Sequence, residues 1–363
     1  MFSENERISG RQLKRLAVLD WIGKACLLLP LFIQRSDGRS FTVSLIIGLG
    51  LTLLYICLIT WLGKQVQNDY FGYVQNRMGK GAALALSLIY WLYAFVNTVY
   101  LVRLFGEVAG TFLLPELEEE LLFALAAAAG CYGAFHGLEG RARTAEALYG
   151  ILLIPLGILL LAAAVPIRPD YLGPGQADFS LEMLARGLQV FMAFGGAGIF
   201  LFVAPRVEEK KTFGKALRRS VVIVGSAALA MFLASVGTFG EEGVRALPWP
   251  AVTLMSTVEI PGGFLQRWDV VFTGLLLTTF FIAVSAGLFY VRLMSEQLLP
   301  WRGRGIYLFP GALAVFLAAC WCKSYETAAR VYVVVNGYIM IPLAVGFTCL
   351  LALIEWNKKR RKS

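Results

Sequence analysis

A lysine stands in the middle of the first long apolar segment of the sequence, where its charge needs a partner. The segment covers about residues 13–33, and Lys24 follows Gly23 near its centre. A charged side chain at the centre of a membrane helix costs roughly 2.5–3.5 kcal/mol on insertion scales. Three interpretations are open: Lys24 pairs with Asp20 one helical turn earlier, it meets the carboxylate of a ligand, or it occupies the place of a coupling cation.

Glycines stand at corresponding places in two apolar segments. Pro30 follows Gly23 by seven residues, and Pro205 follows Gly198 by the same spacing. If these segments begin two halves of five helices each, they run in opposite directions, as in inverted repeats whose broken helices expose main chain to a ligand. Exposed main chain at that depth is tolerated only around a cavity. Close helix packing is the alternative explanation of the glycines.

Polar side chains on neighbouring segments could line the same cavity. Tyr93 and Asn97 lie one turn apart in the third segment, and Gln189 lies in the sixth. Each is also explained by a hydrogen bond between helices. The predicted ligand-binding residues are Ile22, Gly23, Lys24, Ala25, Tyr93, Asn97, Gln189, Phe194, Gly195, Gly196 and Gly198.

The composition predicts an integral membrane protein. Hydrophobic residues make up 58% of the 363 residues, charged residues 16%, and the mean hydropathy is +0.67. We predict an all-α fold of ten transmembrane helices in one membrane domain, with repeats at about 13–166 and 184–355. The predicted helices cover 13–33, 41–63, 82–105, 121–136, 145–166, 184–205, 220–239, 269–291, 305–322 and 331–355.

The basic residues indicate an orientation. The net charge is +9, and most of the 33 Lys and Arg residues fall in alternate connecting segments and at both ends. By the positive-inside rule, both termini face the cytoplasm. Because these charges are spread over loops and form no basic domain, we predict no binding to nucleic acid.

Residues for catalysis or metal binding are sparse. The six cysteines show no C-x-x-C spacing, and His136 is the only histidine. The sequence also lacks a phosphate-binding loop, a nucleophile elbow and a zinc-protease motif. We therefore expect no metal, no cofactor and no enzymatic activity.

Three stretches resemble the B subunits of spore germination receptors. They are "ISGRQLKRLAVLDWIGKACLLLP", "GLEGRARTAEALYGILLIP" before the fifth helix, and "PWPAVTLMSTVEIPGGFLQRWDVV" before the eighth. The similarity spans nearly the whole chain. The matching residues are Ile8, Ser9, Gln12, Ile22, Gly23, Leu29, Pro30, Gly137, Glu139, Arg143, Glu146, Pro250, Pro261, Gly262, Phe264, Arg267 and Asp269.

This resemblance implies a fold similar to that of the amino acid-polyamine-organocation transporters (LeuT/APC-like), with helices 1 and 6 interrupted. It implies a receptor in the inner membrane of a bacterial spore, beside a larger A subunit and a lipoprotein C subunit. The B subunit is taken to bind a small nutrient, typically an amino acid, between helices 1 and 6. Small residues usually follow Gly23 in that family, whereas Lys24 follows it here, which favours an anionic ligand.

Three functions follow from these observations. The first is a receptor subunit in which a bound nutrient shifts the balance between two states of the helix bundle. The second is a proton-coupled amino-acid permease that uses the same pocket. The third is a scaffold for receptor assembly, with an empty pocket.

Overall fold

A computed structural model describes residues 6–28, 38–172, 181–258, 267–299 and 306–360, and these are almost entirely helical. Three short segments form 3-10 helices (η2, η3 and η4), and η5 is a π-helix. The elements in chain order are α1 (Gly10–Leu28), α2 (Gly38–Gly63), α3 (Tyr70–Met78), α4 (Lys80–Phe112), α5 (Glu119–Phe135), α6 (Gly137–Ala163), η2 (Pro169–Leu172), α7 (Leu181–Gly195), η3 (Gly196–Phe202), η4 (Ala204–Arg206), α8 (Lys210–Ala246), α9 (Pro250–Ser256), α10 (Trp268–Leu298), α11 (Leu308–Trp321), α12 (Tyr325–Tyr332), η5 (Val333–Met340) and α13 (Ile341–Arg360).

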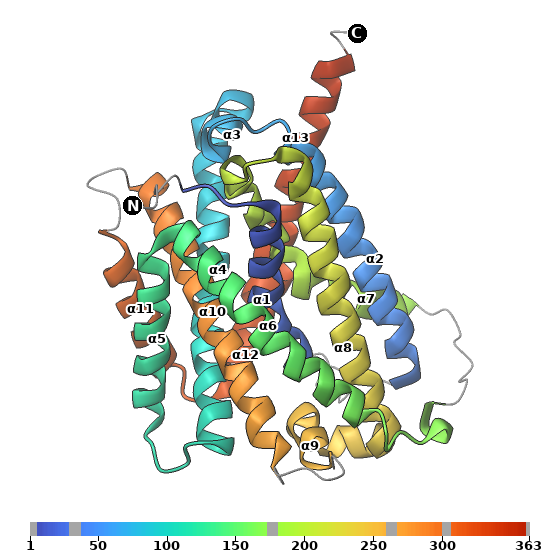
Figure 1. Cartoon of the computed structure of the whole chain (residues 1–363). Coiled ribbons are helices and arrows are strands. Elements are labelled where there is room, and N and C mark those ends of the chain that lie inside the picture. The colour runs from blue at the N-terminus through green and yellow to red at the C-terminus, as the bar shows by residue number, and fades with distance from the viewer. Residues whose placement is uncertain (1–5, 29–37, 173–180, 259–266, 300–305, 361–363) are drawn as a thin grey trace.

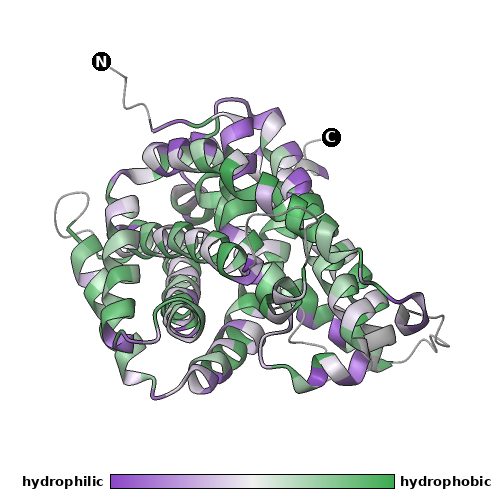
Figure 2. Cartoon of the chain, turned by 60° about the horizontal axis from the view of Figure 1, so that its bottom comes forward, coloured by the Kyte–Doolittle hydropathy of each residue, from purple (hydrophilic) through white to green (hydrophobic). Residues whose placement is uncertain are grey.

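Among the described residues, seven helices are long and apolar enough to cross a membrane. They belong to α2, α4, α6, α7 with η3, α8, α10, and the run from α12 to α13. Figure 2 shows hydrophobic residues along most of these helices. The predicted multi-pass membrane character is therefore confirmed. The count of ten spans stays a prediction, because α5 and α11 are short and α1 carries several charges.

The charged helix α1 lies at the centre of the bundle (Figure 1). It packs along α8, α6 and α10, so other helices surround much of its surface. Charged residues within membrane helices are tolerated where they face the interior of a bundle. This central position explains how α1 keeps its charges although its neighbours are strongly apolar.

Two short helices, α3 and α9, were not predicted, and they lie at opposite ends of the bundle (Figure 1). Asp69 caps the start of α3 by accepting a hydrogen bond from the Gly72 main-chain N–H at 2.9 Å. Arg77 of α3 pairs with Glu355 of α13 at 3.0 Å. Burial, together with the nearby charge of Glu355, raises the pKa of Tyr73 to about 12. The short helix α3 is thus fastened to the end of α13.

The predicted interruption at Gly23 is wrong, because α1 continues as an α-helix through Gly23 to Leu28. A Cβ atom at Gly23 would collide with Thr279 Oγ1 and would lie 3.0 Å from the Phe280 ring. Gly23 therefore allows close packing of α1 on α10, which was the alternative explanation. Pro30 lies outside the described residues.

The second predicted interruption is confirmed. The α-helix α7 ends at Gly195, and the chain continues as the 3-10 helices η3 and η4. A Cβ atom at Gly196 would collide with the Tyr93 hydroxyl, and one at Gly198 with the Tyr90 hydroxyl. Glycine is therefore required at both positions for two tyrosine hydroxyls of α4 to approach the main chain of η3.

A short β-bridge joins the segment before α1 to the segment after η4. The Ile8 N–H donates to the Arg206 carbonyl at 2.9 Å, and the Glu208 N–H donates to the Ile8 carbonyl at 3.1 Å. This parallel bridge ties one end of α1 to the end of the broken helix. The start of α1 and the end of α13 also lie at this end of the bundle (Figure 1).

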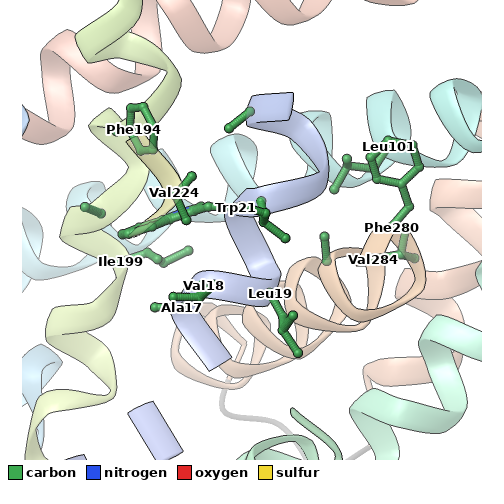
Figure 3. Packing of buried hydrophobic residues seen from close by; sticks show 14 of the residues in the cluster. Ala17, Val18, Leu19, Trp21, Leu101, Phe194, Ile199, Val224, Phe280 and Val284 are labelled. Atoms are coloured by element: carbon green, nitrogen blue, oxygen red, sulfur yellow. The ribbon is translucent and has the colours of Figure 1, made fainter. Parts of the chain in front are cut away.

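The described core includes Trp21, which reaches from α1 toward Phe194 and Ile199 (Figure 3). Its ring meets Phe194 edge-on at 5.9 Å between centroids and Phe200 edge-on at 5.5 Å. Such edge-to-face pairs stabilise by about 0.5–1.5 kcal/mol beyond the area that they bury. Trp21 therefore holds α1 against both sides of the transition from α7 to η3.

The packing at Gly23 predicts a difference between two identical substitutions. Gly23→Ala should lower the free energy of unfolding by about 1–3 kcal/mol, because the new methyl group meets Thr279 and Phe280. Gly50→Ala in α2 meets no atom within 4 Å and should raise stability by up to about 1 kcal/mol through helix propensity. Denaturant unfolding of the purified variants in detergent measures both. Equal stabilities of the two variants would contradict the packing role of Gly23.

Candidate functional site

A cavity of about 40 Å³ lies where α1, α4 and α10 meet the 3-10 helix η3. Its apolar lining includes the side chains of Trp21 and Phe200. Its polar lining comprises the side chains of Asp20, Lys24, Tyr93, Asn97 and Tyr290, together with Gly196. The cavity therefore lies between the charged residues of α1 and the place where α7 changes into η3.

Lys24 is bound to a neutral acceptor. Its Nζ donates a hydrogen bond to Asn97 Oδ1 at 3.1 Å. No carboxylate of the described residues forms an ion pair with it. An ammonium group has three donors, so Lys24 keeps donors that this contact does not use.

Asp20 is paired with Arg141 of α6 and not with Lys24. Arg141 Nη2 lies 3.1 Å from Asp20 Oδ1 and 3.3 Å from Oδ2. The Arg141 side chain is 2% exposed, and its guanidinium lies over the Phe289 ring, 5.5 Å from the centroid. The predicted pair between Asp20 and Lys24 is therefore not formed, although both residues line the cavity.

The three charges do not cancel. Lys24 and Arg141 carry two positive charges, and Asp20 carries one negative charge. Burying a charge is costly unless another charge or several hydrogen bonds compensate it. Lys24 and Asp20 line the cavity, and Arg141, which lies outside the lining, pairs with Asp20, so the group of three residues keeps one positive charge in excess.

A π-helical segment supports the wall formed by α4. Asn336 of η5 is fully buried, and its Nδ2 donates to the Tyr93 carbonyl at 3.1 Å. Its Oδ1 has no hydrogen-bond partner among the described residues. Short π-helical segments occur often at functional sites. The sequence signal for this contact was a single asparagine within an apolar run.

Four predicted ligand-binding residues come together in the cavity: Lys24, Tyr93, Asn97 and Gly196. The others do not line it. Gln189 lies on an exposed face of α7, and Ile22, Ala25 and Phe194 are buried outside the cavity lining. Gly195 is the last residue of α7, while Gly23 and Gly198 pack against α10 and α4.

Sequence reasoning missed the wall that α10 contributes. Ala283, Ala286, Gly287 and Tyr290 all line the cavity from this helix. The signal was a run of small residues at helical spacing, which lets a helix approach its neighbours closely. Arg141 was also missed, because its partner Asp20 lies 121 residues earlier in the chain.

A second hollow, of about 480 Å³, lies beside α3 and is lined by polar residues such as Gln65, Asp69 and Arg77. It touches neither α1 nor η3. Among the described residues, no group of three or more His, Cys, Asp or Glu side chains is placed to hold a metal ion. The smaller cavity is therefore the candidate site, since it combines a buried charge with a broken helix.

Comparison with known families gives one match over most of the chain. The family model described as "Spore germination protein" matches residues 7–328. Spore germination protein KB of Bacillus subtilis (strain 168) is 23% identical over 367 residues, covering 99% of this chain and 97% of that protein. Spore germination protein YndE of the same organism is 23% identical over the full length of both chains. Spore germination protein B2 is 25% identical over 68% of each chain.

Among solved structures, the chain is similar to a Na+-coupled sialic acid symporter in a substrate-bound outward-open state. The TM-score is 0.62 at 12% sequence identity, and the match covers 96% of this chain and 78% of the symporter. At this identity the similarity shows a shared fold. The expectation of a transporter-like helical fold is confirmed at that level.

The buried pair of Asp20 and Arg141 predicts a large stability effect. Arg141→Met leaves a buried carboxylate without its partner and should lower the free energy of unfolding by about 3–5 kcal/mol. The double variant Asp20→Asn with Arg141→Met should recover part of that loss. Thermal and denaturant unfolding in detergent measure both.

Arg143→Met is the matched control, because Arg143 forms an exposed ion pair with Glu139 at 2.6 Å. It should cost less than about 1 kcal/mol. A similar cost at positions 141 and 143, or no recovery in the double variant, would contradict the importance of the buried pair.

Proposed function

The chain belongs to the spore germination protein family, and from this membership we propose that it is the membrane subunit of a germinant receptor. In this proposal a small polar nutrient binds in the cavity between α1, α4, α10 and η3 and helps to trigger germination. The observation that carries it is the arrangement of Lys24 and Asn97 opposite the helix break at Gly196. The subunit acts by binding and has no enzymatic activity.

The size of the cavity supports a receptor with at least two states. A volume of about 40 Å³ has room for about three water molecules, at roughly 10–15 Å³ each. A larger nutrient therefore enters only after the surrounding helices move apart. A ligand that fits one arrangement of the helices better than another shifts the balance between them.

We propose ten spans in two inverted halves, at about 13–166 and 184–355. Helix packing supports this proposal: α1 packs along α8, α2 along α7, and α4 along α10. The first helix of each half thus packs on the second helix of the other half, and the two third helices pack on each other. Inverted repeats are related by a two-fold axis in the membrane plane, and such an axis produces this reciprocal packing.

The proposed location is the inner membrane of the spore, as the family resemblance implies. Both termini are proposed to face the cytoplasm, which the distribution of Lys and Arg supports. The proposed partners are a larger A subunit and a lipoprotein C subunit, as the family resemblance implies. These partners would carry the signal onward, since the described residues form a single helical bundle.

An amino-acid permease coupled to protons is the second candidate. The shared fold with a symporter favours it, because that fold supports alternating access. The receptor and the permease differ in whether an amino acid crosses the membrane. Proteoliposomes that take up labelled amino acids would favour the permease, whereas binding without uptake, together with co-purification of partner subunits, would favour the receptor. If ligands bind nowhere, only the scaffold function is left.

Asn97→Leu tests the proposed site. The substitution removes the acceptor of Lys24 and fills the cavity, so nutrient sensitivity should fall by about tenfold or more, the scale of one lost hydrogen bond to a charged group. The measurement is the loss of optical density of spores carrying the variant, over a concentration series of amino acids, sugars and nucleosides. Protein levels are checked by immunoblotting.

Asn357→Leu is the matched control, because Asn357 is exposed near the end of α13. It should leave nutrient sensitivity within about twofold, as expected for surface substitutions. Normal nutrient responses in spores with Asn97→Leu would contradict binding in this cavity and would favour the scaffold.

A further inference from the structure

We propose that the ligand of this cavity is a compact carboxylate with a net negative charge, such as a 2-hydroxy acid or a 2-oxo acid. This inference rests on the proposed function, because it names the ligand class of the same site. It departs from the expectation of an amino acid, which is a zwitterion with no net charge. Four observations carry it: the donors that face the cavity, the occupied acceptor, the charge balance and the volume.

The polar groups that face the cavity are mainly donors. Lys24 uses one of its three N–H donors on Asn97 Oδ1. Because that contact uses the amide oxygen of Asn97, the amide NH2 group is what Asn97 can still offer to a ligand, and it is a donor. The Tyr290 hydroxyl is buried and has no hydrogen-bond partner among the described residues. These three side chains, from three different helices, offer donors to an oxygen-rich ligand.

The acceptor that a ligand ammonium would need is already occupied. Asp20 is the only carboxylate among the described lining residues, and Arg141 Nη2 bonds both of its oxygens. Moving Asp20 toward a ligand would leave the buried guanidinium of Arg141 without its partner. Two further nitrogens of Arg141, Nε and Nη1, already lack hydrogen-bond partners within the described part of the chain. An amino group on the ligand would therefore add a second cation beside Lys24 without a free carboxylate to receive it.

The charge balance leads to the same ligand class. Lys24 and Arg141 outweigh Asp20 by one positive charge. A monoanion neutralises this excess, whereas a zwitterion leaves it unchanged and a neutral solute does not affect it. Charged groups out of water favour a bound partner of opposite sign. The site therefore discriminates by net charge as well as by shape.

The volume limits the size of the anion. About 40 Å³ equals about three water positions, fewer than the six non-hydrogen atoms of a three-carbon 2-hydroxy or 2-oxo acid, so an acid of this small size requires the least outward movement of the surrounding helices. The apolar wall of Trp21, Phe200 and Ala283 accepts a methyl group. Lactate and pyruvate have this composition, so we take L-lactate as the probe.

Three probes of nearly equal shape test the inference on the purified full chain in lipid nanodiscs. L-lactate, L-alanine and L-lactamide differ in one group each: alanine replaces the hydroxyl by an ammonium, and lactamide replaces the carboxylate by an amide. Binding is measured by calorimetry and thermal shift at constant ionic strength. Lactate should bind at least about tenfold more tightly than alanine or lactamide, as expected where a site is built for one polar group.

Three variants locate the effect. Lys24→Met should abolish the preference for lactate, whereas Lys211→Met, at an exposed position of α8, should leave it unchanged. Asn97→Asp places a carboxylate beside Lys24 and should reduce lactate affinity while alanine affinity rises. Because Lys24→Met removes a partly buried charge that forms no ion pair with a carboxylate of the described residues, it should fold, and melting curves without ligand verify this for each variant.

The outcomes separate this inference from the proposed function. If alanine binds as tightly as lactate and Asn97→Leu removes that binding, the receptor function stands and the anionic ligand class is wrong. If chloride or phosphate competes as well as lactate, the site holds an inorganic anion and the inference is also wrong. If neither these probes nor amino acids, sugars and nucleosides bind, the proposed function fails, and the inference fails with it.

Discussion

The whole arrangement depends on a lysine ammonium held inside a membrane helix bundle. At the centre of a bilayer such a charge costs roughly 2.5–3.5 kcal/mol on insertion scales. The fold reduces this cost by placing α1 in the middle of the bundle (Figure 1) and by giving Lys24 the amide oxygen of Asn97. It does not neutralise the charge, because the nearby carboxylate of Asp20 is paired with Arg141. The excess charge is what distinguishes this cavity from an ordinary packing defect.

The glycines of α1 and of η3 have different structural roles. Gly23 lets α1 lie close to Thr279 and Phe280 while the helix stays continuous. Gly196 and Gly198 let the hydroxyls of Tyr93 and Tyr90 reach the main chain of η3, where the α-helix has already ended. One helix therefore supplies a charged side chain on a regular backbone, and the other supplies the break. The bridge between Ile8 and Val207 holds one end of these two elements together, so a ligand between them could influence both.

The sequence alone was sufficient for the membrane fold, because long apolar runs fill a bilayer whatever their tertiary partners. It also predicted that Lys24, Tyr93 and Asn97 lie at one cavity, since polar residues in apolar runs are few, and the three residues do line the same cavity; their binding of a ligand stays a prediction. It failed where the answer depended on a partner distant in the chain. Asp20 stands one turn from Lys24, yet its partner is Arg141, and local spacing contains no information about that contact. The predictions that Gln189 lines the cavity and that α1 is interrupted at Gly23 failed for a related reason. The neighbouring helix decides which face of a helix is buried and whether a glycine serves close packing.

The most direct test is a distance between the ligand and Lys24. Solid-state NMR can measure the dipolar coupling between 15N-labelled lysine side chains and the 13C-labelled carboxylate of bound lactate in lipid bilayers, with Lys24→Met protein to assign the signal. We predict a coupling that corresponds to an ion-pair separation within about 4 Å and that disappears in the variant. A bound carboxylate without this coupling, or a coupling that persists in Lys24→Met, would contradict the central role of the Lys24 ammonium.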